Sequence, residues 1–186
     1  MKKIILSAVL LATMYGFPAA AETVLDWRWL KGTTWYVPAS GLPAYLYVPD
    51  QNQLIPVKDQ TVYMITGYRN GYFWGRTAAK LSSGEISCSS LVGSVTPEGS
   101  VYLTFTPFPY TDGAEATVGI GKMTIKTGKW SMLNQMSTSS GSVQVGHWAY
   151  MLQTYPGASS WSSLPGVGMS VPDFIAPCMD AAPTTP

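Results

Sequence analysis

Short stretches rich in aromatic and β-branched residues recur along this chain, and a turn signal ends each of them. The clearest pair is 61–68 and 72–81, which flank Arg69-Asn70-Gly71. Asn-Gly accepts the positive φ angles of a tight hairpin turn, so the sequence predicts that these stretches pair as a β-hairpin. Thr96-Pro97-Glu98-Gly99 and Thr127-Gly128 are turn sequences further along the chain.

The same reading predicts strands over most of the chain before residue 153. They cover 33–37, 44–48, 61–68, 72–81, 86–95, 100–106, 116–126, 129–136 and 143–152. No helical segment is long enough to connect parallel strands. We therefore predict an all-β fold, an antiparallel meander of eight or nine strands. A closed barrel would remove the exposed edges of such a meander, and a β-sandwich is the alternative.

The N-terminus has the pattern of a secretory signal peptide. Lys2 and Lys3 are followed by an apolar run over 4–17 and then by Pro18 and Ala19-Ala20-Ala21. A basic start, a short apolar run and a small-residue cleavage site are typical of exported proteins. We predict that residues 1–21 are removed and that the protein is periplasmic or secreted.

Charge is scarce and balanced in the part that remains. The chain has eleven basic residues, and removal of Lys2 and Lys3 leaves nine, against ten acidic residues. No basic patch is available for a nucleic-acid backbone or an anionic membrane surface. We predict no nucleic-acid partner and no integral membrane segment after signal cleavage.

Two cysteines, Cys88 and Cys178, are predicted to form a disulfide in an oxidising compartment. A redox thiol pair is the alternative, but it normally needs a close Cys-x-x-Cys arrangement, which this chain lacks. The predicted organisation is thus a β-barrel domain over 22–152 and an irregular tail, rich in Pro and Ser, over 153–186. The disulfide fastens this tail to the barrel.

The segment Gly32-Thr33-Thr34-Trp35-Tyr36 resembles the Gly-x-Trp-Tyr opening of lipocalin- and avidin-type (calycin-type) barrels. The resemblance implies a closed β-barrel. It departs from the family pattern in two places: one extra residue stands between Gly32 and Trp35, and no basic residue follows the last strand after Leu152. It implies nothing about activity, because one fold serves many functions.

Residues that could carry chemistry are few. His147 is the only histidine, and no nucleophile-elbow motif accompanies the many serines. Asp112 and Glu115 share a loop, where acids are also expected as solvated turn residues. Met132 and Met136 share a strand face, which suits either Cu(I) or the filling of an apolar interior, and the latter reading is preferred. We predict no catalytic residue, metal or cofactor.

Aromatic residues in the strands give the remaining candidate site. Trp35, Trp74, Arg76, Trp130 and His147 are predicted to contact a small ligand at a barrel mouth, since aromatic bodies with polar tips suit such sites. The alternative is that these aromatics form the core.

The function predicted on this basis is non-catalytic binding of a small apolar or aromatic molecule by an exported β-barrel. A protein-interaction or inhibitor module is the first alternative, and it would expose an aromatic patch for a protein partner. A hydrolase is the second, and it would need a cleft that gathers His147 with acidic residues.

Overall fold

The computed structural model describes residues 26–38, 42–81, 84–110, 113, 115–139 and 144–179. The predicted signal segment, residues 1–21, lies outside these ranges, so its cleavage stays a prediction. The strands and the first short helix are η1 Arg28–Leu30, β1 Thr34–Tyr36, β2 Leu42–Val48, β3 Gln53–Arg69, β4 Tyr72–Leu81, β5 Ile86–Val95, β6 Ser100–Pro107, β7 Thr117–Lys126, β8 Lys129–Ser139 and β9 Gln144–Thr154.

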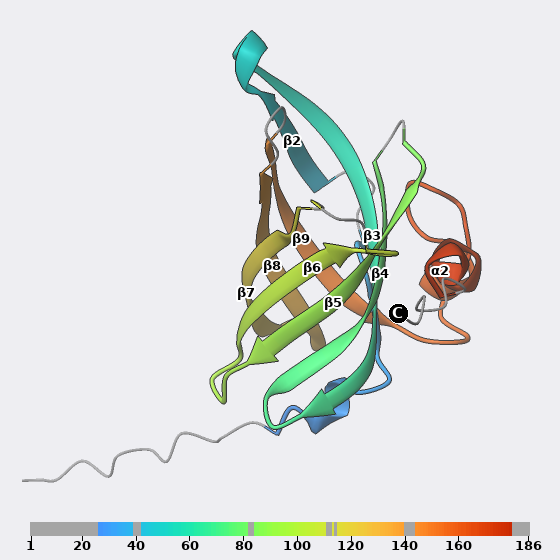
Figure 1. Ribbon diagram of the computed structural model, residues 1–186. Coiled ribbons are helices and arrows are strands. Elements are labelled where there is room, and N and C mark those ends of the chain that lie inside the picture. Colours follow the sequence, from blue (N-terminus) through green and yellow to red (C-terminus); the bar gives the residue numbers. More distant parts are fainter. Residues whose placement is uncertain are drawn as a thin grey trace, which may run out of the picture.

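These nine strands form one antiparallel sheet that closes on itself (Figure 1). From β3 to β9 each strand pairs with the next along the chain, as the hairpin signals predict. Both β1 and β2 then pair with β3 on one side and with β9 on the other. Strands β1 and β2 thus occupy the same place in the barrel wall, between β3 and β9. The nine strands therefore form a barrel that is eight strands around. The predicted closed barrel is confirmed.

The backbone just after β1 pairs with the side chain of Gln60. Its Oε1 accepts the Val37 N–H at 3.1 Å, and its Nε2 donates to the Val37 carbonyl at 3.0 Å. The same Nε2 also donates to the carbonyl of Pro165 at 2.9 Å. The amide thus satisfies the buried backbone N–H and C=O of Val37, as such groups require. It also links this position to the C-terminal segment.

Strands β3 and β8 extend furthest beyond their predicted bounds. β3 begins at Gln53 and not at residue 61, because residues 53–59 pair with β2. Pro56 is tolerated there since pairing of β3 with β4 begins only at Asp59. We call β2, η2 Pro49–Gln51 and residues 53–58 the arm, and it projects beyond the barrel in Figure 1. Strand β8 continues to Ser139, where a loop was predicted from residue 137, because β7 and β9 both pair with it.

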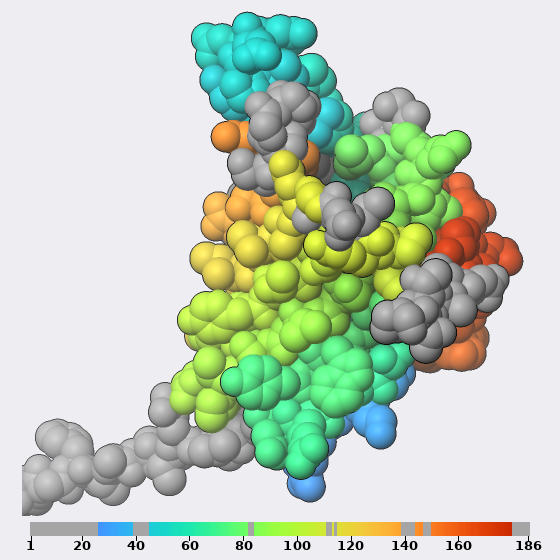
Figure 2. All heavy atoms as spheres, in the orientation of Figure 1, coloured from blue at the N-terminus to red at the C-terminus, as the bar shows by residue number. Residues whose placement is uncertain are grey.

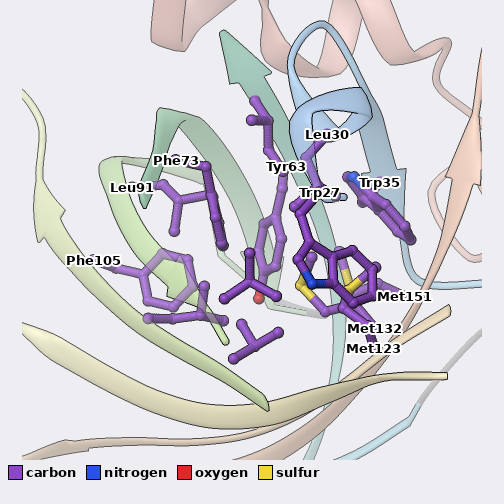
Figure 3. Close-up of a cluster of buried hydrophobic side chains, with 14 of the residues drawn as sticks. Trp27, Leu30, Trp35, Tyr63, Phe73, Leu91, Phe105, Met123, Met132 and Met151 are labelled. Atoms are coloured by element: carbon purple, nitrogen blue, oxygen red, sulfur yellow. The ribbon is translucent and has the colours of Figure 1, made fainter. Parts of the chain in front are cut away.

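One end of the barrel interior is filled by apolar side chains. Figure 3 shows the labelled members of this cluster pointing toward one another from several strands and from the η1 turn. The turn closes that end, with Leu30 fully buried, and the Trp27 indole donates to the carbonyl of Thr96 at 2.9 Å. Fully buried members from the strands include Trp35, Tyr63, Phe73, Met132 and Met151.

The C-terminal segment lies against the outside of the barrel and includes two short helices, α1 Ser159–Ser162 and α2 Val171–Met179. Val171, Phe174, Ile175 and Cys178 of α2 pack on Val62 and Ala78 in a second apolar cluster. The predicted Cys88–Cys178 disulfide is present and ties α2 to β5. Where an irregular tail was predicted, the described part thus carries one helix that covers the wall of β3, β4 and β5 (Figure 1).

Candidate functional site

Of the five predicted ligand residues, Trp35 belongs to the buried core and Trp130 is partly buried and packs against it. Trp35 is fully buried, and its indole donates to the Thr33 hydroxyl at 2.8 Å. Trp130 packs edge-on against Trp27, with ring centroids 5.3 Å apart, and Trp29 lies 6.1 Å from Trp35. These four indoles form a tryptophan cluster at the η1 end of the barrel, so packing accounts for Trp35 and Trp130.

The other predicted residues lie elsewhere. Trp74 is 44% exposed on the outer face of β4. Arg76 lies on the same face, and its guanidinium carbon is 3.4 Å from the centroid of the Phe108 ring, a cation–π contact. His147 is opposite Met136 in the register of β8 and β9, and its side chain lies outside the description. Four of the five are therefore divided between interior and exterior and do not make one site.

A row of polar groups inside the barrel was not predicted. The Thr61 hydroxyl donates to Asp59 Oδ2 at 2.9 Å, and the Tyr63 hydroxyl donates to Met136 Sδ at 3.2 Å. Burial raises the pKa of Tyr63 far above its ordinary value, and the charge of Asp59 raises it further. The Asn134 side chain is fully buried, and its interaction with the Tyr63 hydroxyl offsets part of this rise in pKa, although neither amide atom makes a hydrogen bond of ordinary geometry within the described structure. Nothing in a strand sequence marks such inward polar residues beyond their period-two position.

A groove of about 930 Å3 lies where the arm meets strands β7, β8 and β9. Val118, Ser137, Gly146 and Tyr45 are successive partners across these strands and β2. Val118 is exposed whereas its neighbour Gly119 is buried, so this row lies on the outer face of the barrel. The lining residues are Tyr45, Tyr47, Leu54, Val118, Gly119, Ile120, Gln135, Met136, Ser137, Thr138, Gln144, Val145 and Gly146.

Local sequence explains the hollow. A Cβ built on Gly146 would have no atom within 4 Å, so the missing side chain leaves open space between Ser137 and Tyr45. Tyr47 is oriented by a hydrogen bond from its hydroxyl to Asn52 Oδ1 at 3.2 Å. Asn52 has the positive φ of 46° that ends the η2 turn. The arm therefore supplies one aromatic wall of the groove.

The chemistry of the groove is neutral. The only ionisable side chains among its described lining residues are the phenols of Tyr45 and Tyr47; the others are apolar, hydroxyl or amide groups. The described ranges contain no group of three or more His, Cys, Asp or Glu side chains that could hold a metal ion. Of the acidic pair considered in the sequence, Asp112 lies outside the described residues and Glu115 is exposed and does not line the groove. Such a lining can bind a neutral molecule through apolar contacts and through hydroxyl and amide hydrogen bonds.

Met132 and Met136, the two methionines considered for Cu(I), lie in the apolar core together with Met123 and Met151. Met123, Met132, Met136 and Met151 are all at most 4% exposed, and they pack among the aromatic residues of the interior cluster. Their placement fits the gap-filling use of methionine.

No helix among the described residues has the length and apolarity needed to cross a membrane. Comparisons of the chain with protein-family models, with curated proteins and with solved structures find no significant match. The resemblance to lipocalin- and avidin-type barrels stays a prediction beyond the barrel itself.

Proposed function

We propose that this chain is a non-catalytic binding protein that holds a neutral, partly apolar small molecule in the groove beside the arm. The observation that carries this proposal is the lining: aromatic and aliphatic side chains with two amides and several hydroxyls, and no carboxylate, amine or guanidinium among its described members. Sites for small molecules are typically concave and apolar with a few polar groups that orient the ligand.

The groove is a better candidate than the centre of the barrel. The η1 end of the interior is occupied by the buried side chains of Trp35, Tyr63, Phe73 and Met132, so a ligand there would have to displace core packing (Figure 3). Loss of such packing costs several kcal/mol. The groove, by contrast, is open space in the free protein.

Gly146 provides a direct test of binding in the groove. The probe is Nile red, an uncharged dye whose fluorescence rises in apolar surroundings. We expect it to bind the wild-type protein, and we expect Gly146→Phe to weaken binding at least about tenfold by filling the space, a loss equivalent to about 1.4 kcal/mol. The added ring should not clash, because the Cβ position has no neighbour within 4 Å.

The matched control is Gly84→Phe, which adds the same ring at another open position, where the nearest atom to a built Cβ is the Leu81 carbonyl oxygen at 3.9 Å. This variant should bind the dye as the wild type does. Absence of dye binding to the wild type, or equal binding by Gly146→Phe, would contradict the proposal.

A further inference from the structure

Beyond the groove, the outer wall of strands β4 to β7 exposes a set of apolar side chains, which we call the wall patch. Its members are between 44 and 62% exposed. Strands β5 and β6 lie at the front in Figure 1, and Figure 2 shows the outer surface over them. The patch consists of Tyr72, Trp74, Val92, Tyr102, Val118 and Ile120.

Strand register arranges the patch in two adjacent rows. One row runs from Tyr72 through Ser94, Tyr102 and Ile120 to Gln135. The other runs from Trp74 through Val92, Thr104 and Val118 to Ser137. Val118, Ile120, Gln135 and Ser137 also line the groove, so the two rows lead directly into it. Groove and wall patch are one continuous surface.

Trp74 lies against the wall and does not stand away from it. A Cβ built on Gly67, its partner in register, would be 2.0 Å from Trp74 Cε2 and 2.2 Å from Cζ2. The indole therefore occupies the space where a side chain at residue 67 would be. Gly67 is buried beneath it while the ring remains partly exposed. The arrangement presents an aromatic surface to solvent, and it depends on the glycine.

Two properties of the rows point to one class of occupant. The ten residues of the two rows carry no charge; Arg76 and Lys122 stand only at their borders. Apolar and hydroxyl or amide residues are also interleaved, so that Ser94 separates Tyr72 from Tyr102 and Thr104 separates Val92 from Val118. Protein interfaces instead segregate an apolar centre from a polar rim. A lipid surface would favour basic residues beside the apolar ones.

We propose that the wall patch and groove together bind an extended, neutral polysaccharide. This inference rests on the proposed function, because it takes the groove as one end of the binding surface. A sugar ring combines an apolar C–H face with hydroxyls at its edge, and aromatic rings beside Ser, Thr and Gln complement both. Neighbouring strands are about 4.8 Å apart, comparable to the length of one sugar ring in an extended chain. Successive rings thus meet successive strands.

The test is affinity electrophoresis of the full chain in native gels that contain hydroxyethylcellulose, glucomannan or laminarin, with carboxymethylcellulose as a charged comparator. We expect retardation in at least one neutral gel and weaker retardation with carboxymethylcellulose. Trp74→Ala should weaken polysaccharide binding about tenfold, the upper end of what one aromatic contact contributes. The matched control, Tyr155→Ala, removes an aromatic that is 63% exposed on the C-terminal segment and should bind as the wild type does.

The outcomes separate this inference from the proposed function. Trp74→Ala should leave Nile red binding unchanged, whereas Gly146→Phe should weaken binding of both dye and polysaccharide. Dye binding without retardation in any neutral gel would overturn the inference and leave the groove intact. Absence of both would overturn both. Concentration-dependent dimers that Trp74→Ala dissociates, with no retardation in the gels, would show that the patch serves a second copy of the chain instead.

Discussion

The interior and the outer wall of this barrel are both rich in aromatic residues, yet they differ in what surrounds those residues. Trp35 is fully enclosed and belongs to a cluster of indoles, whereas Trp74 rests on Gly67 with part of its ring in water. In a strand, alternate residues face opposite sides, so both faces of β4 carry large side chains. Aromatic content alone therefore does not distinguish core from binding surface; the neighbours do.

The largest expected difference between the two regions is in stability. Trp35→Ala should lower the free energy of unfolding by about 3–5 kcal/mol, since it leaves a cavity in packed surroundings. Trp74→Ala should change it by less than about 1 kcal/mol, because its ring is partly solvated. Urea unfolding followed by circular dichroism measures both values. Similar losses for the two variants would mean that Trp74 is a structural residue and not part of a binding surface.

Should Trp35→Ala fail to fold, Trp35→Phe keeps most of the ring volume and allows the comparison at smaller amplitude. It should still destabilise more than Trp74→Ala, because it removes the indole donor to the Thr33 hydroxyl as well as packed atoms.

Most of the barrel could be predicted because its signals are local. Asn70-Gly71 and Thr127-Gly128 adopt the positive φ angles that their hairpin turns require, and Val101, Leu103 and Phe105 alternate inward. Which aromatic strand face is inward could not be predicted in the same way, because apolar residues occur on both. Which face turns inward depends on how the whole sheet closes, which is a long-range property. For this reason the predicted ligand residues were found partly inside and partly outside the barrel.

Two of the features that were missed illustrate different reasons. The sharing of one strand position by β1 and β2 depends on the pairing of both with β9, which is distant in sequence. Helix α2, however, carried a local signal: Val171, Phe174, Ile175 and Cys178 have helical spacing, and Ser170 caps the Asp173 N–H at 3.2 Å. Prolines obscured it, although Pro172 falls in the first turn, where proline is tolerated.

The pH dependence of protein stability should also respond differently to replacement of a buried tyrosine and of an exposed one. Because the pKa of Tyr63 is raised in the folded protein, Tyr63 stays neutral there, while the unfolded chain ionises near the ordinary value of 10.0. The stabilisation is complete below that pH and is lost as pH rises above it, by up to about 1.4 kcal/mol per pH unit. Tyr63→Phe should flatten the decline in unfolding free energy between pH 10 and 11. This range starts at the ordinary tyrosine pKa of 10.0, where the unfolded chain begins to ionise.

The control is Tyr72→Phe, which removes an exposed hydroxyl on the outer wall. Its decline with pH should be steeper than that of Tyr63→Phe and match that of the wild type. Equal slopes for the two variants would show that the Tyr63 hydroxyl reaches water in the native state.

The smallest expected effect comes from two adjacent residues of β8 that face opposite sides. Asn134 is fully buried and neither amide atom makes a hydrogen bond of ordinary geometry in the described structure, whereas Gln135 is exposed along the groove. An unsatisfied buried polar group costs about 1–3 kcal/mol. Replacing it with an apolar side chain of similar shape should recover part of that cost, while the same change at the exposed neighbour should not.

Asn134→Leu should therefore raise the free energy of unfolding by about 1 kcal/mol, and Gln135→Leu should leave it within about 0.5 kcal/mol of the wild type. Thermal and urea unfolding of the two variants under identical conditions provide the measurement. A loss of stability in Asn134→Leu would mean that the amide has a partner in the folded protein, either the Tyr63 hydroxyl or an internal water, since both are costly to remove. The interior would then contain a hydrated polar row beside Tyr63, and the contrast with the outer wall would concern access to solvent and not polarity.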